Sequence, residues 1–174
     1  LDPMPADRPL TLRSARTQDV PVIQALVEPL ARERVLLQKE AVAYYEAIQE
    51  FVVAEEADGT LAGFGALHVM WQDIAEVRTL AVSEAHRGAG VGHLLIEELL
   101  DRARAVGVER VFCLTFEVEF FRRHGFEVMA DQSAVDPEVY AELLRSTDEG
   151  VAEFLDLARV KPNTLGNTRM IRRL

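Results

Sequence analysis

Cysteine is nearly absent from the sequence: Cys113 is the only one among 174 residues. A single cysteine cannot form an internal disulfide or supply a cysteine-based metal site, so we expect a reducing, intracellular setting and no bound metal. Long apolar runs are missing as well. The longest stretches, such as residues 91–106, are interrupted by charged side chains, and none approaches the ~20 residues needed to cross a bilayer. No secretory signal is visible, so the sequence predicts a cytoplasmic protein without a membrane partner.

Positive charge is scarce, with 19 Lys and Arg residues against 29 Asp and Glu residues and a net charge of −10. This balance argues against nucleic acid or an anionic membrane as the main partner. A site for a small anionic ligand would need to be locally dense in backbone N–H groups, with a few Arg or Lys side chains. The hydrophobic fraction of 49% and the charged fraction of 28% are those of an ordinary globular protein.

The chain length suits one domain with a sizeable core, and no polar linker or internal repeat divides the sequence. Leu1, Asp2 and Pro3 precede Met4, and we interpret them as the remnant of a tag before a native start. We therefore expect residues 1–8 to be this remnant and a disordered N-terminus. Residues 9–174 are expected to form a single domain.

Apolar periodicity predicts alternating strands and helices. An antiparallel meander is expected from residues 51–55, 61–70 and 74–82, with a strong hairpin signal at Asp58-Gly59. The helical repeat of residues 91–106 and the apolar run of residues 110–116 then predict a helix followed by a central buried strand. Further strands are expected at 10–13, 126–129 and 167–174, and further helices at 17–34 (capped by Thr17), 40–50, 117–124 and 137–145. The predicted fold class is α/β with a mixed sheet, an antiparallel meander followed by a βα crossover.

A glycine-rich segment links the strand ending at Val82 to the helix beginning near Val91. The segment contains Arg87, Gly88, Ala89, Gly90, Val91 and Gly92. A helix N-terminus presents unpaired N–H groups and the positive end of its dipole, and glycines let the backbone approach an anion closely. The pattern predicts a phosphate cradle, with a plain tight turn as the alternative. The dinucleotide fingerprint has a different glycine spacing, and a P-loop is excluded because no Gly-Lys-Ser/Thr follows.

The glycine segment resembles the acetyl-CoA motif of the GNAT acetyltransferases, whose pattern is Arg/Gln-x-x-Gly-x-Gly/Ala. Arg87, Gly90 and Gly92 match that pattern, residues 80–82 resemble the family's cofactor-binding strand, and residues 120–126 resemble its later helix and turn. The resemblance implies a GNAT-like fold and acetyl-CoA as the co-substrate. It also implies that backbone N–H groups of about Arg87 to Gly92 bind the pyrophosphate.

The same resemblance assigns the strand before the loop to the pantetheine arm. That arm would pair with the backbone of the strand segment Leu80, Ala81 and Val82, like an added strand. A nearby backbone N–H would bind the thioester carbonyl and hold the negative charge that develops on its oxygen. Many family members place a tyrosine, as the acid, four residues before the glycine of a Gly-Phe pair. In this chain that position holds Phe121, so the usual acid is absent.

Glu76 is the first candidate for the base that takes a proton from the amine, through a bound water. It opens the strand that carries the cofactor edge, where several family members have a glutamate; the alternative is a solvated charge at a strand end. His68 and His124 are weaker candidates. We expect Cys113 to be a small core residue and not a nucleophile.

A narrower resemblance, to the short single-domain N-acetylglutamate synthases of bacterial arginine biosynthesis, spans residues 36–40, 76–82, 111–126 and 161–170. It implies transfer of an acetyl group to the α-amine of L-glutamate, the first step of that pathway, or to L-glutamine if only one end of the acceptor is read by charge. Two carboxylates need cationic anchors. The implied substrate-binding residues are Lys39, Arg78 and Arg169, with Lys161 and Asn167 as further donors.

Two other functions stay open at this point. One is a GNAT enzyme for another amine, such as a different amino acid, a polyamine or a peptide N-terminus. The other is a non-catalytic acetyl-CoA sensor, which Phe121 at the tyrosine position favours. The sequence does not decide the oligomeric state, and a homodimer is possible.

Overall fold

The computed structural model describes residues 9–33, 36, 39–129, 135–161 and 166–174. The expected tag remnant and disordered N-terminus at residues 1–8 lie outside this part, as do residues 34, 35, 37 and 38 and residues 162–165 of the tail. The strands are β1 (Thr11–Ser14), β2 (Phe51–Glu55), β3 (Leu61–Trp71), β4 (Ile74–Val82), β5 (Arg110–Thr115), β6 (Glu127–Val128) and β7 (Thr168–Arg173). The helices are α1 (Val20–Arg32), α2 (Ala41–Glu46), α3 (Val91–Val106), α4 (Val118–Arg123), α5 (Pro137–Leu143) and α6 (Glu149–Phe154). Short 3₁₀ turns are η1 (Thr17–Asp19), η2 (Ile48–Glu50), η3 (Glu84–His86) and η4 (Ala158–Val160).

The strands form one seven-stranded sheet in the order β1-β2-β3-β4-β5-β7-β6. β1 pairs with β2, and β2 with β3, in antiparallel register, while β4 and β5 are parallel and joined through α3. The predicted mixed sheet, with a meander and a βα crossover, is confirmed. The tail strand also forms, and it lies between β5 and β6.

Several elements differ from the sequence prediction in their bounds or caps. The expectation that Thr17 caps the first helix is wrong, because α1 begins after Asp19 and Thr17 lies within the preceding turn η1. In that turn the Asp19 carboxylate accepts the backbone N–H of Arg16 at 2.7 Å. The helix expected at 40–50 ends at Glu46, and η2 follows. Helix α6 lies in a region for which no element was expected. These differences reflect tertiary contacts and side-chain caps that local periodicity does not encode.

The chain divides into two compact units. The first contains residues 1–67 and 79–102, and the second contains residues 68–78 and 103–174. Strands β3 and β4 contribute residues to both.

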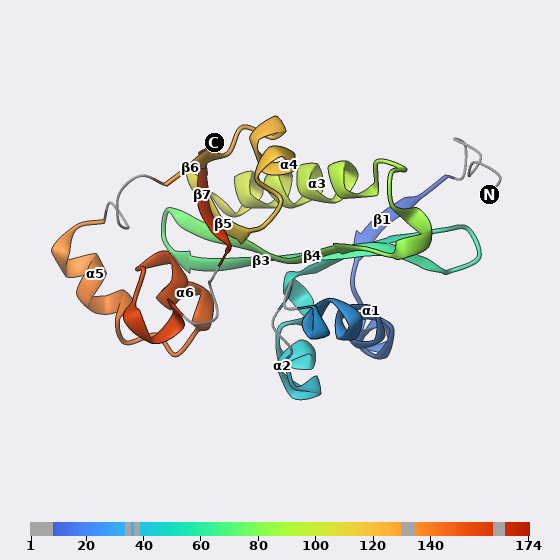
Figure 1. The fold of residues 1–174 in the computed structure, drawn as a ribbon, viewed down its shortest axis with the longest axis horizontal. Helices are drawn as coiled ribbons and strands as arrows, with labels where there is room; N and C mark the ends of the chain where they lie inside the picture. Colours follow the sequence, from blue (N-terminus) through green and yellow to red (C-terminus); the bar gives the residue numbers. More distant parts are fainter. Residues whose placement is uncertain (1–8, 34–35, 37–38, 130–134, 162–165) are drawn as a thin grey trace. The chain divides into compact units, whose positions relative to one another are not determined.

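In the first unit, α1 and α2 cover one face of the β2–β3 hairpin and α3 covers the other (Figure 1). Val20, Ile23 and Tyr44 from the two helices form a core with strand residues that include Val53 and Phe64. On the opposite face, a Cβ added at Gly63 would lie 2.8 Å from the Ala81 carbonyl oxygen and 3.0 Å from a Leu95 methyl carbon. A Cβ added at Gly65 would lie 2.9 Å from the side chains of Leu80 and Leu99. The two glycines therefore let α3 and the end of β4 approach β3 closely.

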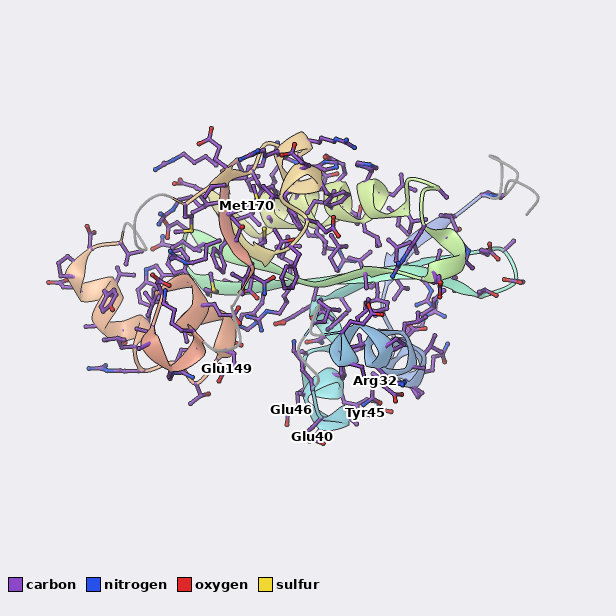
Figure 2. The ribbon with its side chains drawn as sticks, in the orientation of Figure 1. Arg32, Glu40, Tyr45, Glu46, Glu149 and Met170 are labelled. Carbon is purple, nitrogen blue, oxygen red and sulfur yellow. The ribbon has the colours of Figure 1, made fainter. Side chains whose placement is uncertain are left out.

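In the second unit, β5 is a buried central strand. Cys113 of β5 lies opposite Met170 of β7, and both side chains are buried. Figure 2 labels Met170. A core of Ile74, Phe112, Leu143, Val151, Phe154 and Leu155 joins β4 and β5 to α5 and α6. The rings of Phe112 and Phe154 pack edge to face, with their centroids 5.4 Å apart. Helix α6 is therefore packed onto β5, the strand that pairs with the start of β4.

Candidate active site

The glycine segment forms the turn between η3 and α3 that the sequence predicts. Gly88 and Gly90 have φ angles of +80° and +81°, in the left-handed region that favours glycine. No heavy atom lies within 4 Å of a Cβ added at either position. Residues 87–90 are exposed. The glycines therefore serve backbone geometry rather than packing, and the turn is open to a ligand.

The backbone donors of this turn are partly engaged by the turn itself. The N–H of Arg87 donates to Glu84 O and the N–H of Ala89 donates to His86 O, both at 3.3 Å. The first N–H groups of α3, at Val91 and Gly92, have no acceptor within the helix because of their position. Two of the six predicted donors thus hold the turn through long bonds, and the helix start is the better anion site.

A buried histidine fixes the entry to the turn, and sequence reasoning missed it. The Ser83 hydroxyl lies 2.5 Å from His86 Nδ1, and His86 Nε2 lies 2.8 Å from Glu56 Oε1. His86 is only 6% exposed. The chain of contacts ties the end of β4 and the β2–β3 hairpin to the residue that precedes Arg87. The three-residue spacing of Ser83 and His86 across η3 is the sequence feature that could have indicated this contact.

Strand β4 is irregular where the pantetheine arm is expected. Thr79 has a φ of +54°, which is rare for a β-branched residue and interrupts a regular strand. Its hydroxyl accepts a bond from Lys39 Nζ at 3.5 Å, so Lys39, a predicted substrate residue, lies at this irregularity. The parallel pairing of β4 with β5 covers Ile74–Glu76 and does not extend to Leu80–Val82 within the described part of the chain. A strand edge that does not pair with β5 at this point suits an added strand.

Buried Glu76 forms an ion-pair network with Arg78 and Asp148, both of which are half-buried. Arg78 Nε donates to Glu76 Oε1 at 2.6 Å, and its Nη1 and Nη2 donate to Asp148 Oδ1 and Oδ2 at 2.8 and 2.6 Å. Glu76 is 4% exposed, and its Oε2 atom has no hydrogen-bond partner among the described residues. The alternative of a solvated charge at position 76 is therefore wrong.

The network shifts the proton affinities of its carboxyl groups. Burial raises the pKa of Glu76, although the adjacent Arg78 charge lowers it in part. Burial alone would also raise the pKa of Asp148, but the paired Arg78 guanidinium outweighs burial and lowers that pKa to about 2. Asp148 is thus a permanent anion at neutral pH, whereas Glu76 has the raised proton affinity that a general base needs.

Helix α6 covers this network, and only a glycine at position 150 allows it to do so. A Cβ added at Gly150 would lie 2.5 Å from Arg78 Nη2 and 2.7 Å from Glu76 Oε1, and would overlap Glu76 Oε2. Asp148 also caps the helix by accepting the N–H of Val151 at 3.1 Å. Asp148 and Gly150 are functional candidates that sequence reasoning missed, and the aspartate three residues before Val151 was the available capping signal.

A second buried carboxyl lies on α6. Glu153 is 8% exposed. Burial, followed by the negative charge of Glu76, raises the pKa of Glu153 to about 8. No local pattern marks it, because its environment depends on contacts with β4.

The remaining predicted substrate residues have different surroundings. Arg169 donates through Nε to Glu153 O at 3.0 Å and through Nη2 to Phe154 O, so it caps the last carbonyls of α6. Lys161 pairs with Asp156 at an exposed position. Asn167 is half-buried immediately before β7. The structure thus brings Glu76, Arg78 and Arg169 to α6, and places Lys161 in a surface ion pair.

The other chemistry-bearing residues are in apolar or supporting positions. Phe121 is buried and packs its ring against Phe120 and Phe126 at 5.2 and 5.1 Å, so this position supplies no acid. His68 Nε2 lies 3.9 Å from Asp148 Oδ1, at the edge of the network. Cys113 is buried and its pKa is raised well above the ordinary value by burial, which confirms it as a core residue.

The described residues contain neither a metal site nor a membrane span. No group of three or more His, Cys, Asp or Glu side chains among them is arranged to hold a metal ion. None of the helices that they form has the length and apolar character needed to cross a membrane.

Residues 22–126 match the model of the acetyltransferase (GNAT) family. The chain belongs to the GNAT family. The expected resemblance, the fold class and acetyl-CoA as the acetyl donor are confirmed by this membership, so the protein is an acetyltransferase.

This GNAT chain is similar to several named proteins. It is 52% identical over 169 residues to the amino-acid acetyltransferase of Mycobacterium tuberculosis, covering 96% of each chain. The crystal structure of Rv2747 from Mycobacterium tuberculosis, in complex with CoA and NLQ, superposes with a TM-score of 0.89 at 52% identity and covers 94% of this chain and 99% of the other. N-acetylglutamate synthase from Neisseria gonorrhoeae, complexed with coenzyme A and N-acetyl-glutamate, gives a TM-score of 0.75 at 26% identity. That match covers 97% of this chain but 36% of the synthase.

Proposed function

We propose that this acetyltransferase transfers the acetyl group of acetyl-CoA to the α-amine of L-glutamate, with L-glutamine as the alternative acceptor. The observation that carries the proposal is the make-up of β4. This strand holds the buried Glu76–Arg78 pair and, four residues after Glu76, begins the Leu80–Val82 segment that suits pantetheine. The amino-acid acetyltransferase relative, similar over nearly its whole length, supports an amino-acid acceptor.

The residues present fit acetyl-CoA. The exposed turn at 87–90, and the first N–H groups of α3, which have no acceptor within the helix, suit a diphosphate. When bound, acetyl-CoA supplies the thioester carbonyl that the amine attacks. Backbone N–H groups of β4 near Leu80 polarise that carbonyl. Glu76 accepts the proton that the substrate ammonium must lose, through a water molecule because its carboxylate is buried. Phe121 in the tyrosine position has no proton to donate to the sulfur, so the CoA thiol would leave as a thiolate, which a thiol pKa of ~8.5 permits.

Acceptor recognition is assigned to the basic residues that the sequence singled out. Arg78 donates one hydrogen from Nε to Glu76 and one from each Nη atom to Asp148. Each Nη atom carries a second hydrogen, which we assign to a substrate carboxylate. Lys39 and Arg169 are the other proposed anchors, with Lys161 and Asn167 as added donors. Arginine biosynthesis, a cytoplasmic location and a homodimer belong to the same proposal.

A thiol-release assay across the amino acids, polyamines and a peptide amine tests the proposal. We expect L-glutamate to give the highest kcat/KM. A higher value for L-glutamine would select the alternative acceptor, and a higher value for a polyamine would overturn an amino-acid acceptor. Absence of thiol release with every amine would favour the acetyl-CoA sensor.

The Lys39 anchor has its own test. Lys39 is half-buried beside Thr79, and Lys39→Met keeps an unbranched side chain of similar length while removing one charge from the proposed acceptor site. We expect KM for glutamate to rise about tenfold, as for loss of ~1.4 kcal/mol of binding, with KM for acetyl-CoA unchanged. Arg32→Met, at an exposed position on α1, is the control. Equal changes in both KM values would remove Lys39 from acceptor binding.

A further inference from the structure

The turn between β4 and α3 has one buried anchor. Within residues 84–90, all of which the structure describes, His86 alone is buried and the others are exposed. A Cβ added at Gly88 or Gly90 would have no heavy atom within 4 Å, so the turn is not packed against the protein at these points. Glycines also lose more conformational freedom on ordering than other residues. Such a turn needs an anchor elsewhere if it is to be ordered before a ligand binds.

His86 holds the turn through both its backbone and its ring. Its N–H donates to Ser83 O at 2.9 Å, and its carbonyl oxygen accepts the N–H of Ala89 at 3.3 Å. In the ring, Nδ1 lies 2.5 Å from the Ser83 hydroxyl and Nε2 lies 2.8 Å from Glu56 Oε1. A carboxylate only accepts, so Nε2 carries the hydrogen of that contact. Both ring nitrogens are thus engaged, and a shift of the His86 backbone would break contacts with three other residues.

Glu56 gives this contact a rigid base. It directly follows β2, and its N–H donates to Thr60 O at 2.8 Å, which closes the β2–β3 hairpin. The side chains of His86 and Glu56 are only 7% and 10% exposed, so a hydrogen bond to the carboxylate is strengthened by the exclusion of water. Gly59 lies beyond the Glu56–Thr60 bond, so a change at this hairpin tip should leave the carboxylate in place. Glu56, Ser83 and His86 belong to the same compact unit.

We propose that His86, held by Glu56 and Ser83, is a positioning residue for acetyl-CoA: it keeps the turn at residues 87–90 in the conformation that binds the diphosphate. This inference rests on the proposed role of that turn. A protein whose site is competent in only a fraction of the molecules binds its ligand with an affinity reduced by that fraction. If loss of the anchor leaves about one molecule in ten with an ordered turn, the Kd for acetyl-CoA rises about tenfold.

A neighbouring ion pair in the same unit provides a matched control. Glu55, the residue before Glu56, accepts a hydrogen bond from Arg13 of β1 at 3.0 Å. Arg13 also binds the Asp19 carboxylate just before α1, so this pair connects Glu55 to β1 and η1 and not to the turn. Glu55→Met and Glu56→Met therefore remove the same group from adjacent residues, and only the second removes the partner of His86.

Isothermal titration calorimetry with acetyl-CoA tests the proposal in the parent, His86→Phe, Glu56→Met and Glu55→Met. Phenylalanine keeps an aromatic ring but makes neither hydrogen bond. We expect the Kd to rise about tenfold in His86→Phe and about fivefold in Glu56→Met, and by less than about twofold in Glu55→Met. The double variant of His86 and Glu56 should bind no more weakly than His86→Phe, because both changes break one chain of contacts. If His86→Phe and Glu56→Met bind acetyl-CoA as tightly as Glu55→Met does, the inference is wrong.

Hydrogen exchange distinguishes positioning of the turn from a general loss of stability. In the free protein, the backbone amides of residues 87–92 should exchange faster in Glu56→Met than in the parent, and Glu55→Met should match the parent. Saturating acetyl-CoA should remove the difference, because the ligand then orders the turn. For the same reason, KM for acetyl-CoA should rise while kcat stays unchanged. Exchange in free Glu56→Met that equals the parent would overturn the inference.

Ser83→Ala covers the case in which His86→Phe does not fold. It removes only the contact at Nδ1, from a half-buried position, and should raise the Kd for acetyl-CoA about threefold. An unchanged Kd in both Ser83→Ala and Glu56→Met would remove His86 from cofactor binding.

The two proposals fail in different ways. Lack of thiol release with every amine would end the proposed function, whereas calorimetry and hydrogen exchange need no acceptor and would still decide the role of His86. If Gly90→Val bound acetyl-CoA as tightly as the parent, the assignment of the turn would itself be wrong. If Gly90→Val bound weakly and the variants of His86 and Glu56 did not, His86 alone would lose its role.

Discussion

At the scale of single residues, the partners of a side chain matter more than its type. Glu76 and Arg78 are recognisable in the sequence as a candidate base and a candidate anchor. Their partners are not, because Asp148 lies 70 residues away along the chain and reaches Arg78 only through the fold. Gly150 is invisible for the same reason: nothing local shows that a methyl group there would overlap Glu76.

Replacing Gly150 with alanine tests that close contact. In an exposed helix this change would stabilise the protein by up to about 1 kcal/mol, because alanine has the higher helix propensity. At position 150 the added Cβ overlaps the Glu76–Arg78 pair, so we expect the free energy of unfolding to fall by about 1–3 kcal/mol in urea denaturation. Glu149→Ala, on the same turn but exposed, should change it by less than about 0.5 kcal/mol. A more stable Gly150→Ala protein would contradict the placement of α6.

At the scale of elements, apolar periodicity and glycine spacing predicted the helices, strands and turns whose formation depends on nearby residues. Strand β4 and helix α3 have the bounds that periodicity predicts, and the glycine turn between them has the expected left-handed backbone at Gly88 and Gly90. Helix α6 escaped prediction because six residues are too few for a periodic signal. It is stable through Asp148 at one end and Arg169 at the other. Arg169 illustrates the limit: its charge suggested a substrate anchor, and the fold also uses it as a helix cap.

A matched pair of glycine substitutions separates the two roles of the turn. Gly90 and Gly59 have φ angles of +81° and +89°, and neither has an atom within 4 Å of an added Cβ. Valine at either position should cost a similar 1–3 kcal/mol, roughly, in backbone strain. Only Gly90→Val should lose affinity for acetyl-CoA, by more than about tenfold in isothermal titration calorimetry, because only that turn is proposed to bind the diphosphate. Equal affinities in the two variants would contradict the assignment of the loop.

At the scale of the whole molecule, the net charge of −10 opposes the anionic cofactor that the turn is proposed to bind. The proposed site would resolve this conflict with main-chain N–H groups and a helix dipole, which act over a few ångströms and do not alter the net charge. The attraction of the diphosphate to the backbone donors is therefore short-ranged, whereas its repulsion by the net negative charge acts over a longer distance. Salt distinguishes them, since the Debye length falls from about 30 Å at 0.01 M to about 8 Å at 0.15 M.

Raising the ionic strength over this range should therefore speed the association of acetyl-CoA, by a factor of about 2–10, because it screens the long-range repulsion. Dissociation depends on the short contacts within the turn and should change less. Stopped-flow binding of acetyl-CoA measures both rates, and S-acetylpantetheine, which lacks the diphosphate charges, serves as the control whose association should not respond to salt. If the association of acetyl-CoA slowed as salt increased, attraction by basic side chains would dominate its approach, and backbone donors would not be the main source of attraction for the diphosphate.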